Sequence, residues 1–119
     1  MSTTEKLRAG ADFDAVIVLT TLGADADAAA LARTLVAERL AACVNVLATM
    51  TSVYRWQGRV EQDQERQLVI KTTHAQVGAL EQRLRQLHPY ELPEFLVLHT
   101  SGGSEAYLRW VGESTTPTG

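Results

Sequence analysis

The sequence predicts an α+β domain in which two helices lie on one face of a four-stranded antiparallel sheet. Three observations predict it: β-branched apolar runs near both ends, two stretches with helical periodicity, and a long strand-like ribbon between those stretches. The element order is therefore β-α-β-β-α-β, followed by a short terminal helix. This order is the split βαβ, or ferredoxin-like, arrangement. A chain of 119 residues is the usual size for one domain.

The first strand and the first helix come from residues 14–39. The run "DAVIVLTT" over 14–21 is apolar and β-branched, which is typical of a strand covered on both faces. Apolar residues then recur at helical spacing, which predicts a helix over 25–39 with Asp25 or Asp27 as its N-cap.

Residues 41–72 are predicted to form one long β-ribbon. The segment "AACVNVLATMTSVYRW" is rich in valine, threonine and aromatic residues, and "WQGR" contains the glycine of a hairpin turn. A strand of about 14 residues is about 45 Å long, whereas a 100-residue domain has a radius of gyration of about 13 Å. The ribbon must therefore extend beyond its own domain, which predicts a homo-oligomer of closed symmetry.

The remaining elements follow from residues 74–114. Leucines at helical spacing predict a helix over 74–87, which Pro89 cannot continue. "PEFLVLHT" (93–100) is the final strand, and Ser104 is expected to cap a short last helix. We expect a loose arm over 1–12, the folded domain over 13–114 and a tail over 115–119.

Composition argues against several classes of protein. The net charge of −3 disfavours a nucleic-acid-binding protein. The apolar runs are too short to cross a membrane, and the first residues lack the apolar core of a secretion signal. A single cysteine, Cys43, favours a reducing, cytoplasmic location.

Motifs for catalysis or for a strong metal site are absent from the sequence. It contains no zinc-binding spacing, no phosphate-binding loop and no nucleophile elbow, so we expect no enzyme. His74 and His88 lie at opposite ends of one predicted helix, about 21 Å apart, and cannot share an ion within one chain. Cys43 could be a packed core residue instead of a ligand, and His88 could simply cap the helix.

Four blocks nonetheless resemble one known family. "ERLAACVNV", "SVYRWQGRVE", "LVIKTT" and "HPYELPE", in this order and spacing, are similar to the CutA family of divalent-cation tolerance proteins. The resemblance spans residues 14–114. It implies a ferredoxin-like homotrimer, similar in architecture to PII-type signalling proteins, with hairpins interlocked around a three-fold axis. It also implies a role in the response to copper and other divalent metal ions, with no assigned reaction.

The resemblance further implies where a metal could bind. Some family members have a cysteine at the end of the first strand and two adjacent histidines before the Pro-Tyr; this chain has Thr20, and Leu87 followed by His88. The implied site is a weak, reversible copper or zinc site at His88, aided by Glu91 or by groups from a neighbouring subunit. Cys43, which matches a cysteine common in the family, is a further candidate ligand.

Two alternatives stay open. One is a small-molecule or anion sensor with its ligand in the cleft between subunits, where Tyr54, Trp56, Lys71 and Tyr90 would form the walls. The other is a trimeric scaffold that presents a surface to a partner protein.

Overall fold

A computed structural model of the chain describes residues 14–117. The predicted arm over 1–12 lies outside these residues. The secondary structure begins with β1 (Ala15–Gly23), α2 (Ala28–Ala37) and the two hairpin strands β2 (Cys43–Trp56) and β3 (Arg59–Thr73). It continues with a 3-10 turn η2 (His74–Gln76), α3 (Val77–Leu87), β4 (Leu96–His99) and α4 (Glu105–Thr115).

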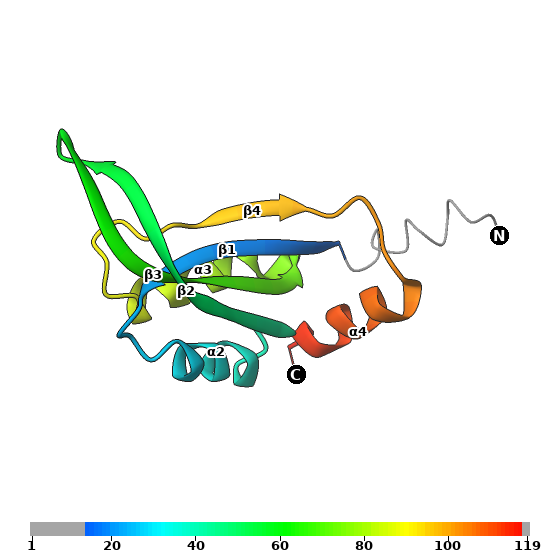
Figure 1. Cartoon of the computed structure of the whole chain (residues 1–119). Helices are drawn as coiled ribbons and strands as arrows, with labels where there is room; N and C mark the ends of the chain where they lie inside the picture. The colour runs from blue at the N-terminus through cyan, green and yellow to red at the C-terminus, as the bar shows by residue number, and fades with distance from the viewer. Residues whose placement is uncertain (1–13, 118–119) are drawn as a thin grey trace.

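The four strands form one antiparallel sheet in the order β2-β3-β1-β4 (Figure 1). The strand β1 therefore lies in the middle, between β3 and β4, although it comes first in the chain. This is the predicted ferredoxin-like topology, and the prediction is confirmed.

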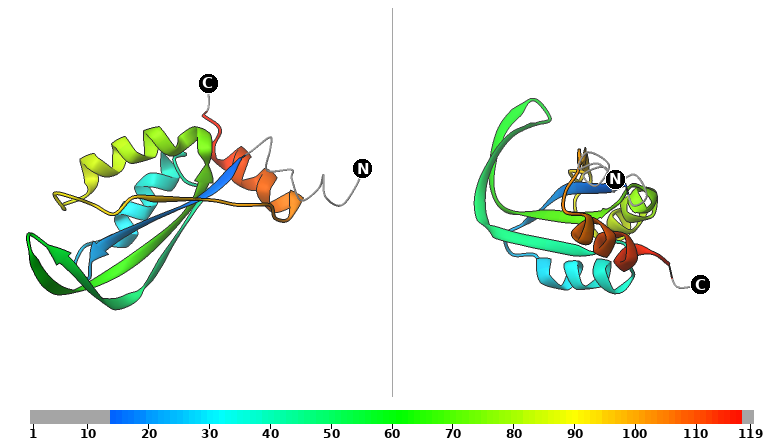
Figure 2. Two further views of the ribbon diagram at one scale, coloured as in Figure 1. Left: turned by 90° about the horizontal axis from the view of Figure 1, so that it is seen from above. Right: turned by 90° about the vertical axis from the view of Figure 1, so that its right-hand side faces the viewer.

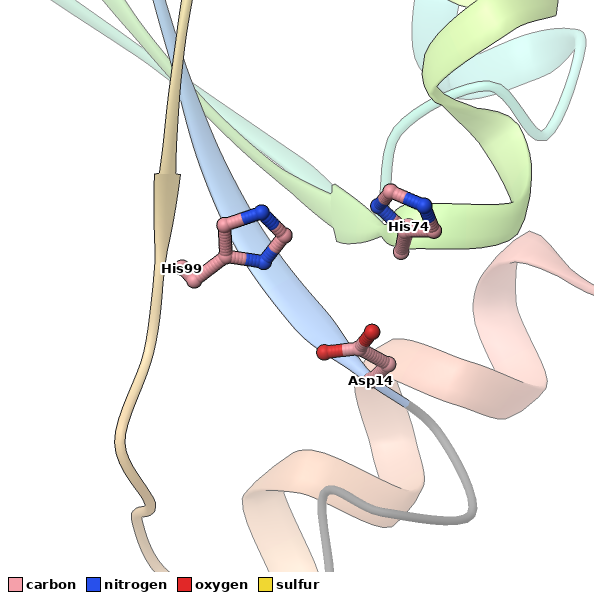
Figure 3. Close-up of side chains that lie close together, drawn as sticks. All are labelled: Asp14, His74 and His99. Atoms are coloured by element: carbon pink, nitrogen blue, oxygen red, sulfur yellow. The ribbon is translucent and has the colours of Figure 1, made fainter.

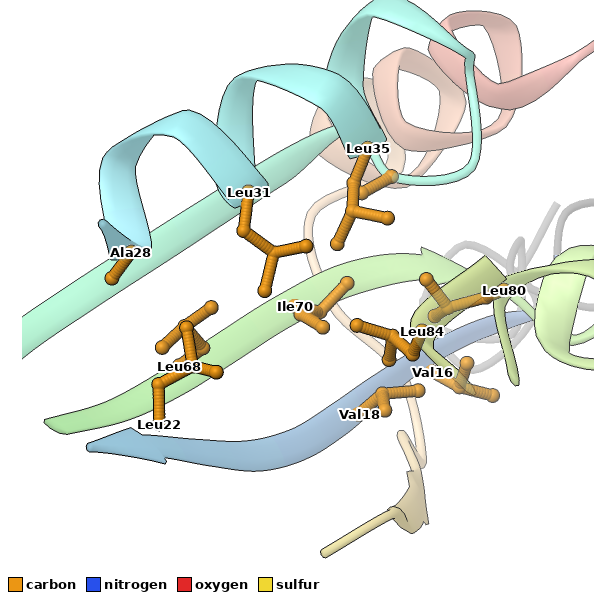
Figure 4. Packing of buried hydrophobic residues seen from close by; sticks show 11 residues of the cluster. Val16, Val18, Leu22, Ala28, Leu31, Leu35, Leu68, Ile70, Leu80 and Leu84 are labelled. Atoms are coloured by element: carbon orange, nitrogen blue, oxygen red, sulfur yellow. The ribbon is translucent and has the colours of Figure 1, made fainter. Parts of the chain in front are cut away.

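The core lies between the sheet and the two helices α2 and α3 (Figure 4). Leu31 and Leu35 of α2 and Leu80 and Leu84 of α3 pack onto buried side chains of β1 and β3, such as Val18 and Ile70. Alternation along the strands sends every second side chain to this side. Asp27 caps α2 through a hydrogen bond from Ala30 N–H (3.0 Å), as one of the two predicted caps.

The opposite face of the sheet is free of helices except at the start of β1, where Leu108 and Val111 of α4 pack with Ala15. The register places Ile17, Leu19 and Val69 on it, beside two residues of the edge strand β4, Leu96 and Leu98. Leu96 is 55% exposed and Leu98 is 49% exposed. An apolar, uncovered sheet face is a candidate surface for association.

The hairpin β2–β3 extends well beyond the rest of the sheet, as predicted (Figures 1 and 2). The molecule measures 54 × 31 × 23 Å. Gln57 and Gly58 both have positive φ (50° and 80°), so the predicted turn at "WQGR" is a two-residue loop of the type that matches the right-handed twist of a hairpin.

A β-bulge interrupts β2. Val46 is opposite Leu68 and Thr49 is opposite Arg66, so β2 has one residue more than β3 in this interval. The extra residue reverses the alternation of the side chains beyond it. As a result Tyr54 and the rest of its row point to the helix-free face, toward which the hairpin curls (Figure 2, right).

Two boundaries differ from the prediction. The last strand starts at Leu96 instead of residue 93, because Pro93 has no N–H for the ladder and the turn before it extends further. Helix α4, capped by Ser104 as predicted, continues to Thr115, which is only 2% exposed. The helix therefore ends one residue past 114.

Arg39 helps to hold α4 in place. Its guanidinium donates hydrogen bonds to the carbonyl oxygens of Glu113, Ser114 and Thr116 at the C-terminal end of that helix. A cation at this end of a helix is also favoured by the helix dipole. None of the helices within residues 14–117 is both long and apolar enough to cross a membrane.

Candidate functional site

A pocket of about 1120 Å³ lies between the curled hairpin and the turn 89–94. The row Met50, Ser52, Tyr54 and Trp56 of β2 forms one wall, since the bulge directs these side chains to this face. Tyr90 and its neighbours in the turn form the other wall. Sequence segments that are about 35 residues apart thus line one space.

The pocket is acidic. Five of its lining residues carry carboxylates, namely Asp25, Asp63, Glu65, Glu91 and Glu94. Among the described lining residues Arg55 is the single cation. Such a site attracts cations and repels anions, and its oxygen ligands are of the kind that hard divalent cations prefer.

Two tyrosines hold two of these carboxylates in place. The Tyr90 hydroxyl donates a hydrogen bond to Glu65 Oε2 at 2.7 Å, and the Tyr54 hydroxyl donates one to Asp63. Burial, together with the Glu65 carboxylate, raises the pKa of Tyr90 well above its usual value of 10.0. The hydrogen bond to Asp63 is the main cause that raises the pKa of Tyr54 to about 12. Both tyrosines are therefore neutral hydrogen-bond donors at physiological pH.

His88, the predicted metal ligand, is 7% exposed and uses both ring nitrogens within its own chain. Its Nδ1 accepts a hydrogen bond from Tyr90 N–H (3.1 Å), so the proton is on Nε2, which donates to the Thr21 carbonyl oxygen (2.6 Å). These bonds connect the end of α3, the turn and β1. A metal ion could bind His88 only if one of them were broken.

The other predicted site residues divide into two groups. Tyr54, Trp56, Tyr90 and Glu91 line the pocket together. Cys43 and Lys71 do not line the pocket, and they are opposite each other in the β2–β3 ladder. Lys71 is four positions along β3 from Gln67, which is opposite Thr21, the residue that accepts a hydrogen bond from His88. Four residues of strand are about 13 Å, so the structure does not bring Cys43 to His88.

Known proteins identify the family. The family model described as "CutA1 divalent ion tolerance protein" matches residues 16–114. This chain belongs to that family. The resemblance noted from the four sequence blocks is therefore confirmed.

Individual CutA proteins are similar to this chain, in sequence and in structure, over nearly the whole domain. The divalent-cation tolerance protein CutA of Thermus thermophilus is 46% identical over 99 residues, which are 83% of this chain and 96% of the relative. A solved structure of the divalent cation tolerance protein from Thermus thermophilus superposes with a TM-score of 0.83, at 44% identity, over 86% of this chain and 99% of that one. CutA1 from Oryza sativa also has a TM-score of 0.83, at 36% identity, over 87% and 95% of the two chains.

The remaining histidines lie at the other end of the sheet. His74 and His99 are close to each other and to Asp14 (Figure 3). The sequence showed no motif for this cluster, because 25 residues separate the two histidines. The signal was in the topology: β1 lies between β3 and β4 and runs antiparallel to both, so its first residue must lie beside their last ones.

Proposed function

We propose that this CutA1-family chain is a non-enzymatic divalent-cation response protein that acts as a homotrimer and receives cations in the acidic pocket under its hairpin. The observation that carries the cation part is the charge of that pocket, with five carboxylates and one guanidinium among its described lining residues. Membership of a family described by divalent ion tolerance supports the cation part. The same charge disfavours the alternative of an anion sensor.

The trimer is supported by the surfaces that a single chain leaves uncovered. The helix-free face of the sheet is apolar, and the hairpin exposes Val53 and Val60, which is 69% exposed. Both edge strands, β2 and β4, also have unpaired backbone groups along their outer sides. Neighbouring copies that cover this face and pair with these edges would solve both problems in a closed assembly.

A manganese titration tests the cation site. Glu91 is exposed in the pocket and makes no side-chain hydrogen bond within residues 14–117, so Glu91→Gln removes a charge with little effect on the fold. We expect Mn²⁺ to bind about fivefold more weakly, because a unit charge about 4 Å from an ion contributes about 1 kcal/mol even in water. Glu113→Gln, on exposed helix α4, is the matched control. Equal isotherms for all three proteins would remove the pocket from the proposal.

Light scattering at micromolar concentration tests the trimer. Trp56 lies at the tip of the hairpin beside the turn, where a neighbouring chain would contact it. Trp56→Ala should weaken the trimer by about 2 kcal/mol or more, as buried aromatic anchors commonly do. Trp110→Ala, on the exposed side of α4, serves as the control. A wild-type protein that is monomeric at these concentrations would contradict the proposal directly.

The copper or zinc site at His88, aided by Glu91, stays a prediction, and Cys43 stays a separate candidate ligand away from His88. Binding at His88 should be weak and reversible, because the ring must first give up a hydrogen bond. A calorimetric titration of Cu²⁺ into wild type and His88→Ala decides it, provided that both proteins are folded. Identical isotherms would assign copper to another site.

A further inference from the structure

We propose that Asp14, His74 and His99 form a binding site for one divalent transition-metal ion, distinct from the acidic pocket and from His88. The ligand class is two imidazole nitrogens and one carboxylate oxygen, which suits Zn²⁺, Cu²⁺, Ni²⁺ or Co²⁺ better than Ca²⁺ or Mg²⁺. The inference does not depend on the proposed pocket, because it uses other residues and other donor atoms.

The sheet register brings the three residues to one place. Val16 of β1 is opposite Thr72 of β3 and His99 of β4. Cross-strand neighbours point to the same face, and so do residues two apart along a strand. Asp14 is two residues before Val16 and His74 is two residues after Thr72, so all three side chains belong to the same face at the same end of the sheet.

Backbone hydrogen bonds hold this arrangement. His74 N–H donates to the Asp14 carbonyl oxygen at 2.8 Å. On the other side of β1, the Thr100 hydroxyl donates to the Ala15 carbonyl oxygen at 2.8 Å. The backbone next to each candidate ligand is therefore fixed independently of the three side chains, which leaves those side chains to bind a metal.

The distances fit a site that closes around an ion. One ligand atom from each residue can be chosen so that all three lie within 4.8 Å of one another, and the two imidazole ring centres are 5.5 Å apart (Figure 3). Ligands about 2.1 Å from one ion are about 3.4 Å apart in tetrahedral geometry. Each pair of ligand atoms must therefore approach by at most about 1.4 Å, which rotation of exposed side chains allows.

Nothing else in the described chain occupies these groups. Within residues 14–117 none of the three side chains has a hydrogen-bond partner, whereas both ring nitrogens of His88 have one. All three residues are exposed, so an ion could enter without any opening of the fold. Exposure also leaves coordination positions for water, as expected of an exchangeable site.

Titration of Cu²⁺ into the full chain, followed by calorimetry and by NMR of the histidine rings, tests the proposal. The chain has three histidines, and β1 separates His88 from the cluster by about seven residues, or about 23 Å. We expect paramagnetic Cu²⁺ to broaden the His74 and His99 signals first, with His88 as an internal control. His74→Gln and His99→Gln should each weaken Cu²⁺ binding at least about tenfold. Mutation of a residue that only hydrogen-bonds to a metal ligand already lowers metal affinity about 10–100-fold.

Three controls keep the outcome decisive. Glu113→Gln should leave Cu²⁺ binding unchanged. Asp14→Asn should weaken Cu²⁺ binding, and it replaces a histidine variant as the test if thermal unfolding shows that the histidine variant is misfolded. Glu91→Gln, which tests the pocket with Mn²⁺, should not change Cu²⁺ binding to the cluster, so the two proposals can fail separately. Unchanged isotherms in both histidine variants, or broadening of His88 before the other two rings, would overturn the site.

Discussion

The two ends of β1 show opposite uses of histidine. At the C-terminal end, His88 lies in "HPYELPE", a segment with three potential ligands within seven residues, yet hydrogen bonds to Thr21 and Tyr90 occupy both of its nitrogens. At the N-terminal end, His74 and His99 belong to no motif, and their rings face each other beside Asp14. The density of ligand-type residues along a sequence therefore does not show which side chains are available to bind an ion.

The largest effect that this comparison predicts is on stability, at His88. His88→Ala removes two hydrogen bonds, leaves a buried carbonyl oxygen unpaired and creates a cavity at the end of α3. The free energy of unfolding should fall by about 2–3 kcal/mol. His99→Ala, at an exposed position, should change it by less than about 0.5 kcal/mol. Urea unfolding measures both, and a stable His88→Ala protein would show that the ring is not structural.

The next prediction concerns how the free energy of unfolding depends on alkaline pH through Tyr90. The folded-state pKa of Tyr90 is raised above its ordinary value of 10.0 by burial and by Glu65. The folded chain therefore holds this proton when the unfolded chain has lost it. The stabilisation is present in full below pH 10 and is lost as the pH rises toward the folded-state pKa.

Tyr90→Phe should lack this part of the pH dependence. The variant also leaves Glu65 without its donor, which should cost about 1 kcal/mol at neutral pH. Unfolding midpoints measured from pH 8 to pH 12 for wild type and variant would show whether the two curves converge at high pH. Curves that stay parallel over this range would mean that Tyr90 has an ordinary pKa.

A smaller effect than those of His88 and Tyr90 is expected at Thr20, next to Thr21, whose carbonyl oxygen accepts the hydrogen bond from His88. The Thr20 hydroxyl is fully buried and has no hydrogen-bond partner among the described residues. Thr20→Val should therefore stabilise the fold by about 0.5–1 kcal/mol. Thr72→Val is the matched control, because the Thr72 hydroxyl donates to the Leu40 carbonyl oxygen at 2.8 Å and should cost about 1 kcal/mol when removed. Opposite signs for the two substitutions would confirm the assignment of the unpaired hydroxyl.

Most of the fold could be predicted because it depends on local signals. Periodicity located both helices, and "WQGR" located the hairpin turn to the residue. The errors are at the ends of elements, where tertiary contacts decide. Thr115 continues its helix because its hydroxyl and those of neighbouring residues find partners in α4 and β3, which composition alone could not show.

The candidate sites were harder to predict than the fold. Tyr54, Trp56 and Tyr90, which were expected with Lys71 as walls of a cleft between subunits, line a pocket within one chain, and Lys71 does not. The state of His88 depends on individual hydrogen bonds, which no spacing rule contains. The Asp14 cluster depends on the alignment of three strand ends, which follows only after the topology is combined with an exact register.

The β-bulge in β2 has a consequence for how this segment could change over time. Beyond the bulge, Tyr54 pairs with Glu61 and Trp56 with Arg59, and the unbroken alternation of β3 fixes the face of each pair. Deleting the extra residue, for example Ala48, would keep these pairs and their face. Deleting a residue after Thr49 while the bulge stays in place would instead shift the row by one and turn Tyr54 and Trp56 toward the opposite side of the hairpin. The bulge is therefore the one place in β2 where a residue can be lost without moving the wall of the pocket.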